Sequence, residues 1–231
     1  MSLKKTLSIF ILALVFLGAC SKDDDPAQTN LRFVHMSPDA PSLDYSINNS
    51  LFIGGNSYTA PTPYRPTNAG SVNVSVSATG TTTPLFNING NFQADKYYSV
   101  FLFDSVGKLK ITGMEDDRTA PPTGKCNVRF LHLGTDQGPV DIIRAGGPIK
   151  LFSNRSFNDH STSASLTGYT AIDPGPFSVS AIVAGSVNTL VTQLPSFPAT
   201  AGKSYTLVLR GFKNAVALSP QSILLGVIED K

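Results

Sequence analysis

The hexapeptide NLRFVH at residues 30–35 returns as NVRFLH at residues 127–132. Each copy is rich in apolar side chains, ends in a histidine, and is followed nine residues after that histidine by Asp44 or Asp141. An apolar run of this length with β-branched and aromatic residues is typical of a strand in a sheet core. The repetition indicates that the chain contains two copies of one β-rich unit.

The neighbouring segments of both copies strengthen this interpretation. Residues 71–78 read SVNVSVSA, so that valines alternate with small polar residues, and residues 176–183 repeat the pattern as PFSVSAIV. Alternation with a period of two predicts a strand with one buried face. The runs YYSVFLF at 97–103 and SYTLVLR at 204–210 are more continuously apolar, as central strands are.

Turn residues recur between these strands, and no segment sustains a helical pattern of apolar residues. The chain is therefore expected to be all-β, with two tandem antiparallel β-sandwiches of the immunoglobulin-like or transthyretin-like kind. The first sandwich is placed at residues 30–117 and the second at 126–231, with a linker at 118–125 that contains Pro121 and Pro122. We expect each sandwich to fold independently.

Composition narrows the possible functions. Only 15% of the 231 residues are charged, while 41% are hydrophobic, which suits a packed core better than a helical bundle or a disordered chain. The formal net charge of +2 becomes zero once Lys4 and Lys5 are set aside as part of a leader. A neutral protein offers no electrostatic basis for binding nucleic acid, so nucleic acid is not an expected partner.

Residues 1–19 have the features of a signal peptide, with Lys4 and Lys5 before an apolar run of 11 residues. That run is too short to span a bilayer, which takes about 20 apolar residues. The LGAC tetrad at residues 17–20 resembles a bacterial lipobox, and the resemblance implies that Cys20 carries palmitate or a similar acyl group. The alternative is an ordinary cleaved signal peptide.

Residues 20–29 are expected to form a flexible, acidic tether. Its SKDDD sequence at residues 21–25 resembles the export signal of surface lipoproteins of the Bacteroidetes. The resemblance implies a protein anchored in the outer membrane and facing the cell exterior. A solvated charge run on the periplasmic face is the alternative.

The sequence HMSPDAPSLD at residues 35–44 resembles the hallmark of the bacterial "domain of unknown function 4397" family. The resemblance extends through both copies and implies a secreted β-sandwich without an established activity. The second copy departs from the pattern, because HLGTDQGPVD at residues 132–141 lacks the first proline and the alanine.

The repeated histidines and aspartates are candidates for chemistry or for structure. In a hydrolase, His35 would act with Asp39 or Asp44, and a metal site would require further ligands that neither copy supplies nearby. In the structural interpretation His35, Asp44, His132 and Asp141 bond backbone groups of loops, and repetition favours this role. We therefore expect no catalytic residue, no metal and no cofactor, and we expect Cys126 to be an inert buried thiol.

Two loops are candidate ligand sites. The stretch at residues 58–66 combines Tyr58, Tyr64 and Arg65 with three prolines, a rigid and amphipathic combination suited to recognition. The polar stretch at 153–163, with Asp159 and His160, is either a second binding loop or a solvated loop.

The remaining predictions concern modification and partners. Ser105 lies in a DSV sequence that matches a short O-glycosylation pattern of exported Bacteroidetes proteins. The predicted function is a non-catalytic binding or adhesion module for an extracellular polysaccharide or protein, held in the membrane by its lipid. The alternatives are an accessory subunit that binds an outer-membrane barrel and, less favoured, a hydrolase with a site near His35.

Overall fold

The computed structural model describes residues 25–145, 149–217 and 219–230 of the chain. The first half contains eight strands, β1 (Gln28–Met36), β2 (Leu43–Ile47), β3 (Ser50–Asn56), β4 (Arg65–Asn68), β5 (Gly70–Ala78), β6 (Pro84–Phe92), β7 (Tyr97–Phe103) and β8 (Lys110–Glu115). The second half contains β9 (Cys126–His132), β10 (Val140–Arg144), β11 (Ile149–Arg155), β12 (Thr170–Ile172), β13 (Gly175–Val183), β14 (Leu190–Ala199), β15 (Ser204–Arg210) and β16 (Leu224–Glu229). The all-β prediction is confirmed.

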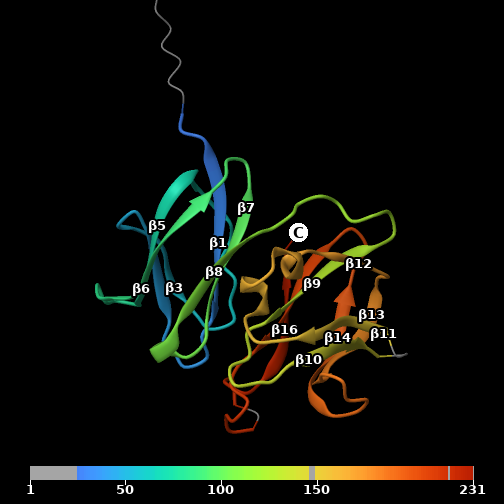
Figure 1. The fold of residues 1–231 in the computed structure, drawn as a ribbon. Helices are drawn as coiled ribbons and strands as arrows, with labels where there is room; N and C mark the ends of the chain where they lie inside the picture. The colour runs from blue at the N-terminus through green and yellow to red at the C-terminus, as the bar shows by residue number, and fades with distance from the viewer. Residues whose placement is uncertain (1–24, 146–148, 218, 231) are drawn as a thin grey trace, which may run out of the picture.

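The two halves have the same topology. Sheets β3-β2-β5-β6 and β4-β1-β7-β8 form the first sandwich, and sheets β11-β10-β13-β14 and β12-β9-β15-β16 form the second. Figure 1 shows the four sheets side by side, with the β1 and β9 sheets in the middle. The molecule is thus a stack of four sheets, in which the two sandwiches pack against each other.

One pair of strands in each half differs from the expected antiparallel pattern. Strand β1 pairs with β7 in parallel, and β9 pairs with β15 in the same way. The other pairings are antiparallel. The parallel pair arises because the chain, after returning to the β1 sheet as β4, crosses to the opposite sheet for β5 and β6 and re-enters at the end where β1 began.

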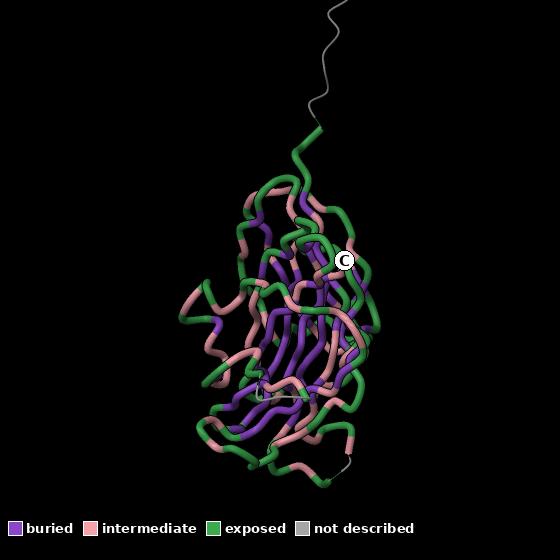
Figure 2. Tube along the Cα trace, turned by 90° about the vertical axis from the view of Figure 1, so that its right-hand side faces the viewer, coloured by how far each residue is buried: buried purple, intermediate pink, exposed green. Residues whose placement is uncertain are grey.

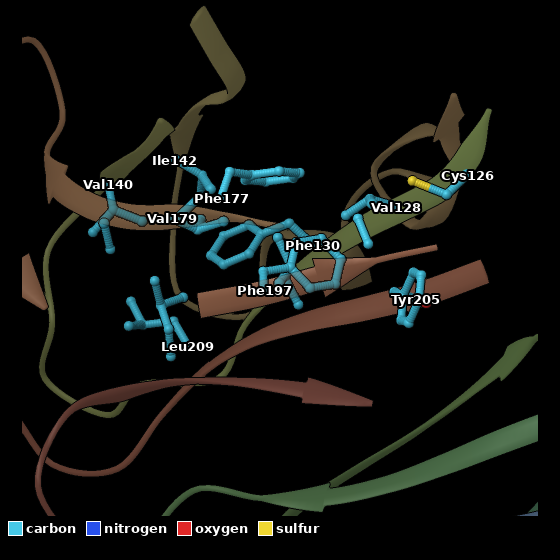
Figure 3. Close-up of a cluster of buried hydrophobic side chains, with 14 residues drawn as sticks. Cys126, Val128, Phe130, Val140, Ile142, Phe177, Val179, Phe197, Tyr205 and Leu209 are labelled. Atoms are coloured by element: carbon cyan, nitrogen blue, oxygen red, sulfur yellow. The ribbon is translucent and has the colours of Figure 1, made fainter. Parts of the chain in front are cut away.

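The period-two pattern places its apolar side chains between the sheets. In β5 the valines at 72, 74 and 76 are buried, while the polar residues between them are half-buried. The first core also contains Phe33 and Tyr45, whose rings stack with centroids 4.2 Å apart. The second core contains Phe130, Phe177 and Phe197, which Figure 3 shows converging between the sheets.

A third apolar cluster lies between the two halves. Strands β1, β7 and β8 contribute side chains from one side, and β9, β15 and β16 contribute them from the other: Val34, Met36, Phe101, Phe103, Met114, Leu131, Leu133, Val208 and Ile228. These side chains are all at most 5% exposed. Buried segments therefore run continuously through the middle of the molecule, as Figure 2 shows. This shared cluster argues against the expectation that each half folds independently, because separation would expose it to water.

Candidate functional site

The face between the halves carries a buried arginine from each hexapeptide. Arg32 of β1 reaches across to the second half, where its Nη2 donates to the Asp230 carboxylate and its Nη1 to the Glu229 backbone oxygen at 3.1 Å. Its Nε donates to Ser99 Oγ at 2.6 Å within its own half. The guanidinium lies 4.7 Å from the ring centre of Tyr64, a cation–π distance.

Arg129 of β9 makes the same contacts in the opposite direction. Its Nη2 donates to the Asp116 carboxylate and its Nη1 to the Glu115 backbone oxygen at 3.2 Å, both in the first half. Its Nε donates to Thr206 Oγ1 at 2.7 Å, and Tyr169 lies 4.8 Å from the guanidinium. Each half thus supplies one arginine and one aspartate to the other, an arrangement related by an approximate two-fold axis.

Tyrosine hydroxyl groups complete the network. Tyr64 donates to Asp116 Oδ2 at 2.7 Å, and Tyr169 donates to Asp230 Oδ2 at 2.8 Å. Burial and the Asp116 charge raise the pKa of Tyr64, so its hydroxyl keeps its proton and remains a donor at neutral pH. Tyr64, predicted as a ligand-binding residue, is therefore placed in the contact between the halves.

The repeated histidines and aspartates bond the backbone of their own loops. His35 is buried and its Nε2 lies 3.0 Å from the Pro41 oxygen, while His132 Nε2 lies 3.3 Å from the Gly138 oxygen. Asp44 accepts from the backbone N–H of Gly55 at 2.7 Å and of Gly80 at 3.3 Å. These contacts hold the loops in place and lower the pKa of Asp44.

Asp141 does the same in the second half. Its carboxylate accepts from the backbone N–H of Asn154 at 2.8 Å and of Gly185 at 3.2 Å, and from Lys150 Nζ at 2.7 Å. The lysine and these backbone donors lower the pKa of Asp141. Each aspartate thus joins the neighbouring strand, β3 or β11, to the turn after β5 or β13, which is the geometry that a structural role requires.

The proposed hydrolase residues are not joined by hydrogen bonds in this structure. Asp39 accepts from the backbone N–H of Val106 at 2.8 Å, and Asp44 is engaged as described above. Burial lowers the pKa of His35, which disfavours its charged form. Among the described residues, no group of three or more His, Cys, Asp or Glu side chains is arranged to hold a metal ion.

The stretch at 153–163 is only partly solvated: Arg155 and His160 are buried, while Ser153, Asn154, Ser161 and Thr162 are exposed. It contains the end of β11 and the short 3-10 helix η2 (Asp159–Ser161), and His160 is only 5% exposed. Asp159 accepts from Arg155 Nε at 2.7 Å and from Nη2 at 2.9 Å. His160 lies 5.7 Å from Phe103 of the other half, and burial lowers its pKa from 6.5 to about 4.

Tyr58 also contacts the other half. Its hydroxyl oxygen accepts from Arg210 Nη1 at 3.3 Å, and its ring lies 5.2 Å from that guanidinium. Of the five predicted ligand residues, Tyr58 and His160 thus contact the other half. Tyr64 holds Arg32 and Asp116, whose side chains cross between the halves, and Asp159 forms an internal ion pair. Arg65 alone among them is exposed and lines a pocket.

That pocket opens between β3 and β4, at one edge of the first sandwich. Its volume is about 370 Å³, within the usual range of about 300–1,000 Å³ for small-ligand sites. The lining residues that matter here are Ile53, Asn56, Ala60, Pro61, Pro63 and Arg65. We call this the β3–β4 pocket, and it lies along the rigid loop that the sequence singles out.

Two side chains of the β3–β4 pocket carry polar chemistry. Arg65 Nη1 donates to the Phe52 backbone oxygen at 2.9 Å, which orients the exposed guanidinium. Asn56 is 7% exposed and donates from Nδ2 to the Ala60 oxygen at 2.8 Å, whereas its Oδ1 accepts no hydrogen bond among the described residues. An unpaired buried acceptor is costly, and a donor supplied by a ligand would remove that cost.

The predicted burial of Cys126 is confirmed, whereas the glycosylation of Ser105 stays a prediction. Ser105 is half-buried in the turn before the 3-10 helix η1 (Val106–Lys108), and its backbone N–H donates to Asp104 Oδ1 at 2.8 Å. Cys126 is a buried free thiol, and burial raises its pKa. Cys20 and the signal peptide lie outside the described residues, and none of the described helices is long and apolar enough to cross a membrane.

Sequence reasoning missed the crossed arginine–aspartate pairs and Asn56. A signal for the first was present, because Arg32 and Arg129 occupy the same position inside two apolar hexapeptides. A charge there demands a buried partner. The partners Asp230 and Asp116 lie far away in sequence, and only the folded chain identifies them.

A search of the curated proteins finds no match to this chain. Residues 29–143 match the family model described as "Domain of unknown function (DUF4397)". The match contains all of β1–β9 except the first residue of β1, and it ends inside β10 of the second half. This match assigns residues 29–143 of the chain to the DUF4397 family.

Proposed function

We propose that this protein is a lipid-anchored, non-catalytic binding module of the bacterial cell envelope. Its second half would serve as a closed support, and its first half would present the β3–β4 pocket to an extracellular polysaccharide or protein. The observation that carries the proposal is this open pocket, lined by the exposed Arg65 and by Asn56, whose amide oxygen is buried and unpaired. Rigid loops on a β-sandwich commonly carry binding sites of this kind.

The anchor is the second part of the proposal. Cys20 would carry the acyl groups, the acidic residues after it would direct the protein to the cell exterior, and Ser105 would be glycosylated. The two halves would be two copies of one family domain, with a Bacteroidetes origin. Their common strand order and the repeated hexapeptides support this part of the proposal.

An array of glycans and peptides tests the binding function with the full chain in mild detergent. We expect at least one ligand whose signal falls about tenfold in Ala60→Asp, because a carboxylate there narrows the β3–β4 pocket. Ala94→Asp makes the same chemical change in an exposed turn after β6 and should leave the signal unchanged. No bound ligand, or equal loss in both variants, would contradict the proposal.

Labelling of cells with palmitate tests the anchor. Wild-type protein should incorporate the label and be digested by protease added to intact cells, whereas Cys20→Ala should remain unlabelled. Labelled protein that resists the protease would instead place the module on the periplasmic face, where an envelope partner or an outer-membrane barrel becomes the expected ligand.

A further inference from the structure

The two halves can be superposed in register at the β3–β4 pocket. Leu43 pairs with Asn56 across β2 and β3, and Val140 pairs with Arg155 across β10 and β11. Asn56 and Arg155 therefore hold equivalent positions in their sandwiches. Four residues later, Ala60 in the first half corresponds to Asp159 in the second.

The backbone confirms this correspondence. The N–H of Ala60 donates to the Ser57 oxygen at 3.1 Å, and the N–H of Asp159 donates to the Ser156 oxygen at 3.1 Å. In the same way, Thr59 bonds the oxygen of His35 and Asn158 bonds that of His132. The two loops thus begin with the same turn.

In the second half this place holds a carboxylate. The Arg155 guanidinium binds both oxygens of Asp159 and lies 5.3 Å from the Phe130 ring and 6.0 Å from the Phe152 ring. Its Nη2 also donates to the Leu166 backbone oxygen at 3.2 Å. The fold therefore accommodates a two-pronged arginine–carboxylate contact at this position, using the chain's own aspartate.

In the first half both members of that pair are missing. Asn56 replaces Arg155, Ala60 replaces Asp159, and Ile53 replaces the larger Phe152, so that the β3–β4 pocket opens where the pair would lie. Arg65 supplies a cation from β4, and no acidic residue lines the pocket. The described lining of the pocket is thus complementary to a negative charge.

We infer that the β3–β4 pocket recognises a hydroxylated carboxylate, specifically a uronic acid unit of an acidic polysaccharide. This inference rests on the proposed binding function and names its ligand. The carboxylate pairs with Arg65, which can bind it through two N–H groups. A ring hydroxyl supplies the donor that Asn56 Oδ1 lacks, and the C–H face of the sugar packs against Pro61 and Pro63.

An acidic peptide shares the carboxylate but not the hydroxyl. The Asp and Glu side chains of a peptide offer acceptors only, so the Asn56 oxygen would stay unpaired. Methyl esterification of a uronate removes its charge while leaving its hydroxyl groups in place. These two comparisons separate the carboxylate from the hydroxyl as determinants of binding.

Calorimetric titration of the full chain in mild detergent provides the test, with trigalacturonate, its methyl ester and triglutamate as probes. We expect trigalacturonate to bind and the methyl ester and triglutamate to bind at least tenfold more weakly. Arg65→Gln should weaken trigalacturonate binding at least tenfold. Arg144→Gln is the matched control, since Arg144 in the second half also donates from Nη1 to a backbone oxygen, that of Asp173 at 3.1 Å.

The outcomes distinguish this inference from the function on which it rests. Equal binding of trigalacturonate and its ester, or stronger binding of triglutamate, would overturn the uronate assignment. If the array then still shows a ligand that Ala60→Asp weakens, the binding function stands with another ligand. If neither experiment gives binding that depends on the pocket, both proposals fail.

Discussion

The two halves of the molecule share one strand topology, but the same edge of the sandwich is filled in the second half and open in the first. At the edge between β11 and β12, Arg155 and Asp159 form an ion pair whose arginine is 4% exposed, and a longer loop packs over it. At the equivalent edge between β3 and β4, small side chains leave a pocket of about 370 Å³. The difference shows that this strand topology allows either a filled or an open edge. A few side chains decide which of the two forms.

The opposite edge shows the same contrast. By the strand registers, Gly90 and Gly113 of the first half correspond to Phe197 and Val227 of the second. The smaller pair leaves an apolar pocket of about 180 Å³ between β6 and β8. The second half fills the corresponding space with Phe197, which is fully buried in the core shown in Figure 3.

The largest expected effect comes from the contact that joins the halves. Arg129→Met leaves the Asp116 carboxylate buried without its arginine and should lower the free energy of unfolding by about 3–5 kcal/mol. Arg32→Met should lower the free energy of unfolding by less, because Arg129 lies 3.9 Å from Asp230 and still pairs with its charge. Urea unfolding of the full chain measures both changes.

Equal losses in the two variants would show that the two crossed pairs are energetically equivalent. A loss below about 1 kcal/mol for Arg129→Met would mean that the pairs do not hold the halves together. The double variant Arg129→Met/Asp116→Leu is the control, since removing both charges should restore much of the stability.

Acid should weaken the contact at the η2 side of the same interface. The pKa of His160 is lowered to about 4 in the folded protein, so between pH 6.5 and 4 the unfolded chain binds more protons. The contribution of His160 to the free energy of unfolding is therefore full above pH 6.5. It is lost as the pH falls toward 4, a loss of up to about 3 kcal/mol.

Unfolding in urea at pH 7 and pH 4.5 measures this loss in wild type and in His160→Leu. The leucine variant should lose less stability on acidification. Identical pH dependence in the two proteins would contradict a role for His160.

Removing the ion pair that fills the edge of the second half should lower the free energy of unfolding by less than the two preceding changes. Asp159→Ala leaves Arg155 without its carboxylate and should lower the free energy of unfolding by about 2 kcal/mol. Acetate added to the variant should recover part of the loss by pairing with Arg155. Thermal unfolding with acetate and with chloride at equal ionic strength checks this, and no difference between the salts would contradict it.

The smallest expected effect is an increase in stability from a substitution at the edge between β6 and β8. Gly113→Val copies Val227 of the second half, and a Cβ at residue 113 would lie 3.5 Å from the Phe92 ring, an ordinary contact. The added side chain should raise the free energy of unfolding by about 0.5–1 kcal/mol. Val227→Gly is the reciprocal variant and should be destabilised, as urea unfolding would show.

Much of the fold was predictable because it follows from local patterns. Alternation in residues 71–78 identified a strand, and the repeated hexapeptide identified two similar halves. The structural role of His35 was predictable because its partner Pro41 lies six residues away, whereas Asp44 also bonds Gly80, 36 residues away. The parallel pairing of β1 with β7 depends on chain direction in space, which local patterns do not encode.

The candidate site was predictable only in part. The rigid loop and Arg65 stood out by composition, but Tyr58 of the same loop contacts the other half, and Tyr64 packs on Arg32, which reaches across to it. Which residues remain available for a ligand depends on how the halves meet. A pocket formed by small residues such as Ala60 also leaves no sequence signal, because it consists of side-chain volume that is missing.

The central claim is that the first half binds a ligand at an edge that the second half closes with its own side chains. Backbone amide NMR shifts of the full chain, recorded as trigalacturonate is added, test it most directly. The account predicts shifts at residues 53–65 and none at the equivalent residues 152–170. Shifts confined to 152–170, or equal shifts in both regions, would contradict it.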